Sequence, residues 1–192
     1  MLSHFLRKNK EENPKLTQIK SYSDNCGGQN KNQYFGAAVN LIAARTGLEI
    51  THTYLERGHT YNAADTYHSM IERRSRSVNL YTPAEWYDLM GKTSRNKKKQ
   101  IEVVQVTQDH IYDFHELAEK RLNVKKNTDG EAVPWSEIRQ LIASPLRSNE
   151  LGYRTEFKGP IKTICLNRVG RPVNALTYPL PRAYTIAPSC SN

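Results

Sequence analysis

The chain has 192 residues, a formal net charge of +9 and an isoelectric point of about 9.5. With 38% hydrophobic residues and a mean hydropathy of −0.72, no stretch approaches the roughly 20 apolar residues that a membrane span needs, so no membrane partner is expected. Cys26, Cys165 and Cys190 are few and far apart. They argue against a disulfide framework and for a reducing compartment, nuclear or cytoplasmic.

The positive charge is uneven, because the first hundred residues hold 16 Lys and Arg against 9 Asp and Glu. Its densest groups are Arg73, Arg74 and Arg76, and Lys97, Lys98 and Lys99. Such groups bind the phosphate backbone of DNA by releasing counterions, without reading its sequence. A solvated helix face for the first group, and a linker or nuclear-localisation patch for the second, remain open alternatives.

The first predicted elements are a strand at residues 16–20 and a polar turn at residues 21–30. This order places Asp24 and Asn25 at the carboxyl end of the strand, with Gln29 close behind them. Open α/β sheets hold their sites at such ends, and the glycines of the turn let a ligand approach the backbone closely. A polar turn without function is the alternative, since Asn, Asp and Gly are common turn residues.

A helix is predicted for Asn32–Thr46, with its apolar side chains on one face and Gly47 as its stop. A second strand is predicted at residues 48–55. A polar turn follows, and it contains His59, which either caps the turn or meets a substrate phosphate. The next helix is expected from about Ala63 to Ser77.

Three polar side chains of that helix share one face at i, i+3 and i+7: Asp65, His68 and Glu72. The neighbouring stripe of Ala64, Tyr67 and Ile71 is apolar and is expected to pack on the sheet. Carboxylates that converge from a strand end and a helix can hold divalent cations through their oxygens. His68 would assist such a site or would be a polar residue on the rim of the helix.

A further helix is predicted to begin at Thr82, because Thr82, Pro83 and Glu85 form the pattern of a capping box. The polar and basic residues after Gly91 mark a boundary. The predicted organisation is therefore a core at residues 1–91, a basic linker at 92–100 and a loop-rich α+β segment at 101–192.

The C-terminal segment shows no chemistry in its sequence. Its predicted strands are residues 101–106, 151–157, 162–168 and 173–178, and its predicted helices are residues 113–121 and 134–141. Trp86 and Trp135 are interpreted as core anchors rather than as platforms on which bases stack.

The first part of the chain resembles the second half of a ribonuclease-H-like nucleotidyl-transferase core, as in retroviral integrases and DDE/DDD transposases. The chain is similar still more closely to a domain that occurs in transposon-derived animal proteins. The residues that carry the resemblance are Asp24–Asn30, Gly58, His59, Asp65, His68, Ile71, Glu72 and Tyr81–Trp86. The resemblance implies an α/β fold with a partial ribonuclease-H-like core. It makes Asp24 the second acid and Asp65 the third, with Glu72 as the alternative.

The resemblance also implies DNA as substrate and Mg²⁺ or Mn²⁺ held by Asp24 and Asp65, with Asn25, Gln29 and His59 near the substrate. The first Asp of the family has no counterpart among the 23 residues before Asp24. Two-metal chemistry needs both ions about 3.5–4 Å apart. The resemblance therefore implies an N-terminally truncated core with weak metal binding and little or no activity, which the missing part or a homo-oligomer would complete.

Three interpretations stay open at this point. The chain is a metal-dependent nuclease or nucleotidyl transferase, or a non-catalytic module that binds DNA or another protein, or a truncated frame that folds poorly. The last one is a contender because two parallel strands cannot bury both faces without neighbours.

Overall fold

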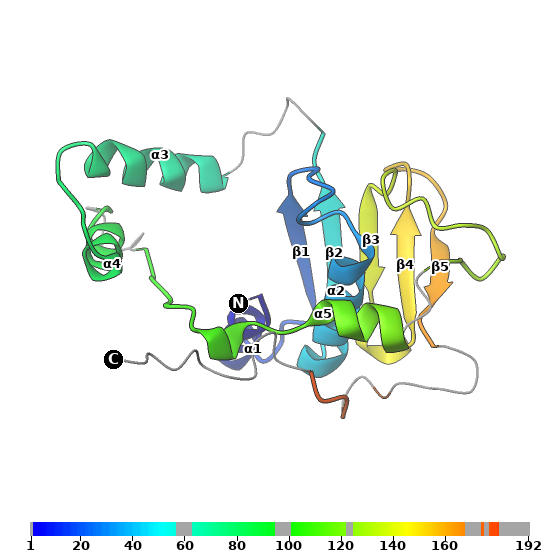
Figure 1. Ribbon diagram of the computed structural model, residues 1–192. Coiled ribbons are helices and arrows are strands. Elements are labelled where there is room, and N and C mark those ends of the chain that lie inside the picture. Colours follow the sequence, from blue (N-terminus) through cyan, green and yellow to red (C-terminus); the bar gives the residue numbers. More distant parts are fainter. Residues whose placement is uncertain are drawn as a thin grey trace, which may run out of the picture. The chain divides into compact units, whose positions relative to one another are not determined.

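The computed structural model describes residues 2–56, 63–94, 101–121, 125–167, 174 and 177–180. The chain forms two compact units, one of Met1–Gly58 with Thr107–Asn192 and one of His59–Val106 (Figure 1). These units do not follow the predicted boundaries at residues 91 and 101, because strands from both sides of those boundaries share one sheet.

The first unit is built on a mixed five-stranded sheet with the order β1-β2-β3-β4-β5 (Figure 1). β1 (Gln18–Ser23) and β2 (Glu49–Tyr54) are parallel, and both were expected from the sequence. The other strands continue the sheet in antiparallel order: β3 (Gln140–Ala143), β4 (Glu150–Arg154) and β5 (Lys162–Cys165). The fold is therefore of the α/β class, as predicted.

Helix α2 (Gln33–Thr46) connects the two parallel strands and packs on one face of the sheet. Its start is fixed by Asn32, whose Oδ1 accepts a hydrogen bond from the Phe35 N–H at 2.9 Å. Its end is fixed by Gly47, which has φ 67° and donates its N–H to the Ala43 carbonyl. A residue with a Cβ is strained at this φ, which explains why a glycine stands here. The predicted end of the helix at Gly47 is confirmed.

The core lies between the sheet and α2. The largest fully buried side chains of the sheet alternate along each strand and face the helix; they are Ile50, Tyr54, Leu141, Leu151, Tyr153 and Ile164. Burying one aliphatic side chain of this size stabilises the fold by about 1.5–3 kcal/mol. The antiparallel strands thus supply the neighbours that the parallel pair needs to bury its apolar side chains.

Short helical segments complete the first unit. α1 (Leu2–Glu12) buries Leu6 and packs against α2. α5 (Phe114–Glu116) begins at Asp113, whose Oδ1 accepts from the Glu116 N–H, and it continues as a π-helical turn over Leu117–Arg121. The helix predicted at residues 113–121 is present as these two pieces.

The second unit consists mainly of α3 (Ala63–Ser75) and α4 (Pro83–Gly91). The predicted capping box of α4 is confirmed, because the Thr82 N–H donates to Glu85 Oε2 at 2.8 Å and the Glu85 N–H donates to Thr82 Oγ1. Of the described residues of this unit, Leu89 and Thr93 alone are buried. Tyr67, expected to be buried, is 40% exposed, and Trp86, expected in the core, is 37% exposed.

Two predicted elements are wrong. Residues 101–106 form no strand, and Val104 and Val106 are exposed. The helix predicted at 134–141 does not form either, because residues 140–143 are β3. Tertiary pairing of Leu141 with strands on both sides outweighs the helical spacing of the local apolar residues. Half of the strand predicted at 173–178 falls outside the described residues, and residues 174, 177 and 178, which are described, are not in a strand.

Candidate functional site

The candidate site lies at the carboxyl end of the parallel strands, where Asp24 follows β1 directly and is exposed to solvent. The loop after it is closed by the Cys26 carbonyl, which accepts from the backbone N–H groups of Asn30 at 2.9 Å and Lys31 at 3.0 Å. Asn32 ties this loop to α2, since its side-chain amide donates to the Gln29 carbonyl at 3.2 Å. The loop therefore presents Asp24 in a defined conformation at the end of the sheet where α/β folds place their sites.

The Asp24 carboxylate is held on one oxygen. Asn30 Nδ2 donates to Asp24 Oδ1 at 2.9 Å, and the Asn30 carbonyl accepts from the Tyr54 hydroxyl at 2.8 Å. Burial raises the pKa of Tyr54, so this hydroxyl keeps its proton and remains a donor. No described residue forms a hydrogen bond or an ion pair with the other carboxylate oxygen, Oδ2, which leaves it available to a ligand.

His52 lies on β2 beside this loop and is only 4% exposed. Ser21 Oγ is 2.8 Å from its Nδ1 and Ser23 Oγ is 3.0 Å from its Nε2, so both ring nitrogens have a hydroxyl partner. Ser23 Oγ also donates to the Asp24 carbonyl at 2.9 Å. The imidazole is thus connected to the backbone of Asp24 through a single serine.

Aromatic rings surround the imidazole of His52. Phe35 and Tyr54 contact it edge-on, with ring centroids at 4.7 and 4.8 Å. Burial among these groups lowers the pKa of His52 to about 4, so the ring is neutral at neutral pH. Lys31 is buried as well, and its Nζ lies 5.6 Å from the centre of the Tyr54 ring.

The other predicted acids belong to the second unit. Asp65 is in the first turn of α3 and is partly exposed, whereas His68 and Glu72 are exposed. Glu72 Oε1 forms an ion pair with Arg76 at 2.9 Å, one turn along the same helix. Asp24 and Asp65 therefore lie in separate compact units.

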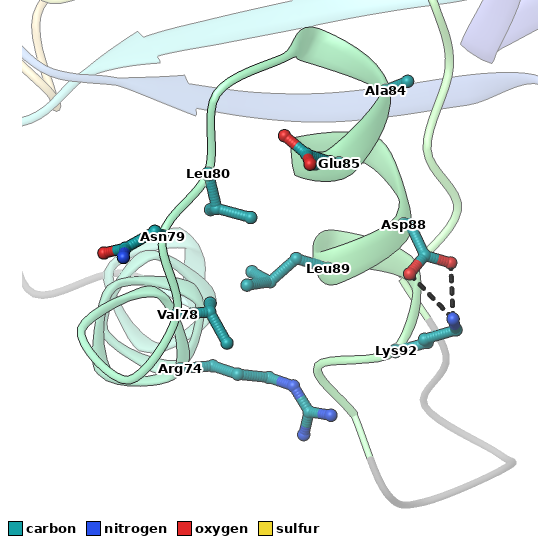
Figure 2. Close-up of a pocket in the computed structure, with 9 residues that line it drawn as sticks. All are labelled: Arg74, Val78, Asn79, Leu80, Ala84, Glu85, Asp88, Leu89 and Lys92. Atoms are coloured by element: carbon teal, nitrogen blue, oxygen red, sulfur yellow. Dashed lines mark hydrogen bonds and ion pairs between the residues drawn. The ribbon is translucent and has the colours of Figure 1, made fainter.

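Two predicted phosphate ligands, Arg73 and Arg74, are exposed at the end of α3 and have no carboxylate partner among the described residues. Arg74 borders a hollow of about 530 Å³ between α3 and α4 (Figure 2). Val78, Leu80 and Leu89 point into this hollow, and an ion pair of Asp88 with Lys92 at 2.7 Å lies on its rim. An anionic group that carries an apolar neighbour would contact Arg74 and these apolar side chains there.

Gln29, predicted to lie near a substrate, is exposed and lines a groove of about 440 Å³ between α2 and residues 110–114. Aromatic side chains supply much of its wall: Tyr34, Phe35, Tyr112 and Phe114. Asn25 is in the same loop as Asp24 and is partly exposed. His59 and the lysines Lys97, Lys98 and Lys99 lie outside the described residues.

The structure shows no preformed metal centre among the residues that it describes, since none of their His, Cys, Asp and Glu side chains form a group of three that could hold an ion. Of the predicted acids, Asp24 alone is in the first unit. None of the helices in the described part of the chain is long and apolar enough to cross a membrane.

Sequence reasoning overlooked most of the residues that surround Asp24: Ser21, Ser23, Asn30, His52 and Tyr54. A signal was present, because Ser21 and Ser23, like His52 and Tyr54, are two residues apart on a strand and so face the same side. Asn25 is predicted to lie near the substrate, and the amide that contacts the Asp24 carboxylate is that of Asn30.

The comparisons with known proteins give one match. The model of a family described as a domain of unknown function, DUF7869, matches residues 1–134, more than half of the chain. The search of the curated proteins and the search of the solved structures found no match.

Proposed function

The chain belongs to the DUF7869 family, and we propose that it is a fragment of a transposase- or integrase-like protein whose ancestral reaction was metal-dependent cleavage and strand transfer of DNA. The observation that carries the proposal is Asp24, an exposed carboxylate at the carboxyl end of two parallel strands. Its loop holds one oxygen and leaves the other available. In this chain alone the activity is weak or absent, and contact with DNA phosphates is the property that remains.

The proposed metal chemistry uses Asp24 as an oxygen ligand of Mg²⁺ or Mn²⁺. Two-metal catalysis needs both ions about 3.5–4 Å apart, which takes more carboxylates than the Asp24 loop supplies. Asp65, the other predicted ligand, is in the first turn of α3, which belongs to the second unit. A cation is therefore held weakly, and cleavage is slow or does not occur.

DNA contact in this proposal comes from the end of α3. Arg73 and Arg74 are exposed, and neither has a carboxylate partner among the described residues. Arginine recognises phosphate oxygens with a planar, bidentate fork. Lys97, Lys98 and Lys99 form a second basic group in the sequence, and the nucleus or cytoplasm is the proposed place of action.

A non-catalytic DNA-binding module is the second candidate, and a specific contact favours it. Glu72, the alternative third acid, is engaged by Arg76 at 2.9 Å. The neighbouring Arg73 and Arg74 remain available to bind phosphate. In this candidate, DNA binding depends on salt but is indifferent to Mg²⁺ and to Asp24.

The test measures binding and metal dependence on one preparation. Fluorescence anisotropy with a labelled DNA duplex gives affinity at several salt concentrations, and nuclear magnetic resonance (NMR) line broadening by Mn²⁺ locates the cation. Asp24→Asn is compared with Asp129→Asn, a matched control because Asp129 is an exposed acid of the same unit. The control shows whether the loss of one negative charge elsewhere in the unit has the same effect.

Broadening confined to residues 24–31, lost in Asp24→Asn and kept in Asp129→Asn, supports the metal site of the transposase-like fragment. Salt-dependent duplex binding without such broadening favours the non-catalytic module. A chain that neither binds a duplex at low salt nor shows localised broadening contradicts both.

A further inference from the structure

The hydrogen bonds around His52 have only one consistent direction. Ser23 has a single hydroxyl proton, and it donates that proton to the Asp24 carbonyl, which can only accept. The contact of 3.0 Å between Ser23 Oγ and His52 Nε2 therefore requires the proton to be on Nε2. For a neutral ring, Nδ1 is then the acceptor, and Ser21 donates to it at 2.8 Å. The chain of donors runs from Ser21 through His52 and Ser23 to Asp24.

A second chain of donors reaches the same residue from the next inward-facing position of β2. The Tyr54 hydroxyl donates to the Asn30 carbonyl at 2.8 Å, and the Asn30 amide donates to Asp24 Oδ1 at 2.9 Å. The first chain thus ends on the backbone of Asp24 and the second on its carboxylate. The ring within the first chain, His52, and the ring that starts the second, Tyr54, contact each other in the core, with their centroids 4.8 Å apart.

We propose that His52 and Tyr54 are positioning residues, which fix the backbone and the carboxylate of Asp24 so that Oδ2 is presented to a divalent cation. The inference rests on the proposed function in one respect, namely that Asp24 is the acid that binds metal. Residues behind a metal ligand set its orientation, and their loss typically lowers metal affinity about 10–100-fold. Both rings are buried in the core, so the hydrogen bonds that start from them restrict the motion of the Asp24 carboxylate.

The experiment breaks each chain of donors at one link. Ser23→Ala removes the link to the Asp24 carbonyl, and Tyr54→Phe removes the hydroxyl that holds Asn30. Ser21→Ala is the matched control, because it deletes a bond of the same kind to the same imidazole but leaves both links to Asp24 intact. Ser23→Thr keeps a hydroxyl and is the rescue variant.

Two readouts need no DNA. Ring ¹⁵N shifts report which nitrogen of His52 carries the proton, and amide hydrogen exchange over residues 24–31 reports opening of the loop. We expect the Nε2–H form, and exchange about fivefold faster in Ser23→Ala and in Tyr54→Phe, the effect of losing one ordinary hydrogen bond. The exchange rates of Ser21→Ala and Ser23→Thr should stay near those of the unmodified chain. A ring protonated on Nδ1, or equal exchange in Ser21→Ala and Ser23→Ala, overturns the proposal.

The third readout is the apparent affinity for Mn²⁺, from line broadening at the loop. We expect it to fall at least tenfold in Ser23→Ala and in Tyr54→Phe, and to be unchanged in Ser21→Ala. Equal affinities in all four variants contradict a positioning role. If the unmodified chain does not bind Mn²⁺, the metal part of the proposed function and the cation role of Oδ2 fail together. The ring and exchange data then decide whether His52 and Tyr54 fix Asp24.

Discussion

Gly36 on α2 lies directly against the indole of Trp135. A Cβ built on Gly36 would be 2.7 Å from Trp135 Cη2 and 2.9 Å from its Cζ3, closer than real Cβ contacts come. The helix can therefore approach this part of the core because residue 36 has no side chain. Trp135 is partly buried there and packs against the core, as its interpretation as an anchor required.

Gly36→Ala should destabilise the first unit. Alanine gains up to about 1 kcal/mol of helix propensity over glycine, but overpacking of a filled core costs about 1–3 kcal/mol. We expect the packing cost to exceed the gain, with a net loss of about 1 kcal/mol in the free energy of unfolding by urea. The same substitution in a Trp135→Phe background should cost less, since the two closest atoms that the methyl meets are gone and Leu151 Cδ2 at 3.1 Å remains. An equal cost in both backgrounds would contradict the contact.

The stability of the first unit should depend on pH through His52. Its pKa falls from 6.5 to about 4 on folding, so between these values the unfolded chain binds more protons than the folded one. The stabilisation is present above pH 6.5 and is lost as the pH falls toward 4, by about 3 kcal/mol in total. Urea unfolding at a series of pH values measures it. His52→Asn should flatten this part of the profile, and an unchanged slope would show that other groups cause it.

The arginines at the end of α3 should control the salt dependence of DNA binding. Each phosphate contact contributes about −0.9 to the slope of log affinity against log salt concentration. Replacing Arg73 and Arg74 by Ala should therefore make the slope less negative by about 1.8. Arg147→Ala is the control, since Arg147 is an exposed arginine of the other unit. A slope that changes as much in the control would mean that the charge of the whole chain, and not α3, binds DNA.

Thr82→Ala should unravel the first turn of α4. The Thr82 hydroxyl accepts from the Glu85 N–H, and loss of such a cap costs about 1 kcal/mol of helix stability. Amide hydrogen exchange along α4 should rise at its N-terminal end, while Ser69→Ala on the exposed surface of α3 should have little effect. Uniform exchange along α4 in both variants would argue against the cap.

The Glu85 carboxylate should make the same helix end sensitive to acid. Hydrogen bonds from the backbone N–H groups of Tyr81 and Thr82, and from the Thr82 hydroxyl, lower the pKa of Glu85. The support it gives is therefore present above the ordinary pKa of Glu and is lost as the pH falls through the lowered value. Chemical shifts of the first turn of α4, followed during an acid titration, should move in that range. They should not do so in Glu85→Gln.

The sequence alone determined the elements whose signals are local. α2 begins after Asn32 and ends at Gly47, and α4 begins with the Thr82–Glu85 capping box, because each boundary is made by groups within four residues of each other. β1 and β2 follow from the alternation of their side chains, which is also a local signal. The position of Asp24 at the carboxyl end of a strand follows from that alternation and from the polar turn after it.

The tertiary structure alone decided the rest, because the deciding contacts join distant residues. The apolar spacing around Leu141 fits a helix, and only its neighbours on β2 and β4 make it a strand. Likewise His52 is 31 residues from Ser21 and 29 from Ser23, a separation at which sequence patterns carry no information on contact. The parallel pairing of β1 with β2 closes that distance and brings the imidazole to the backbone of Asp24.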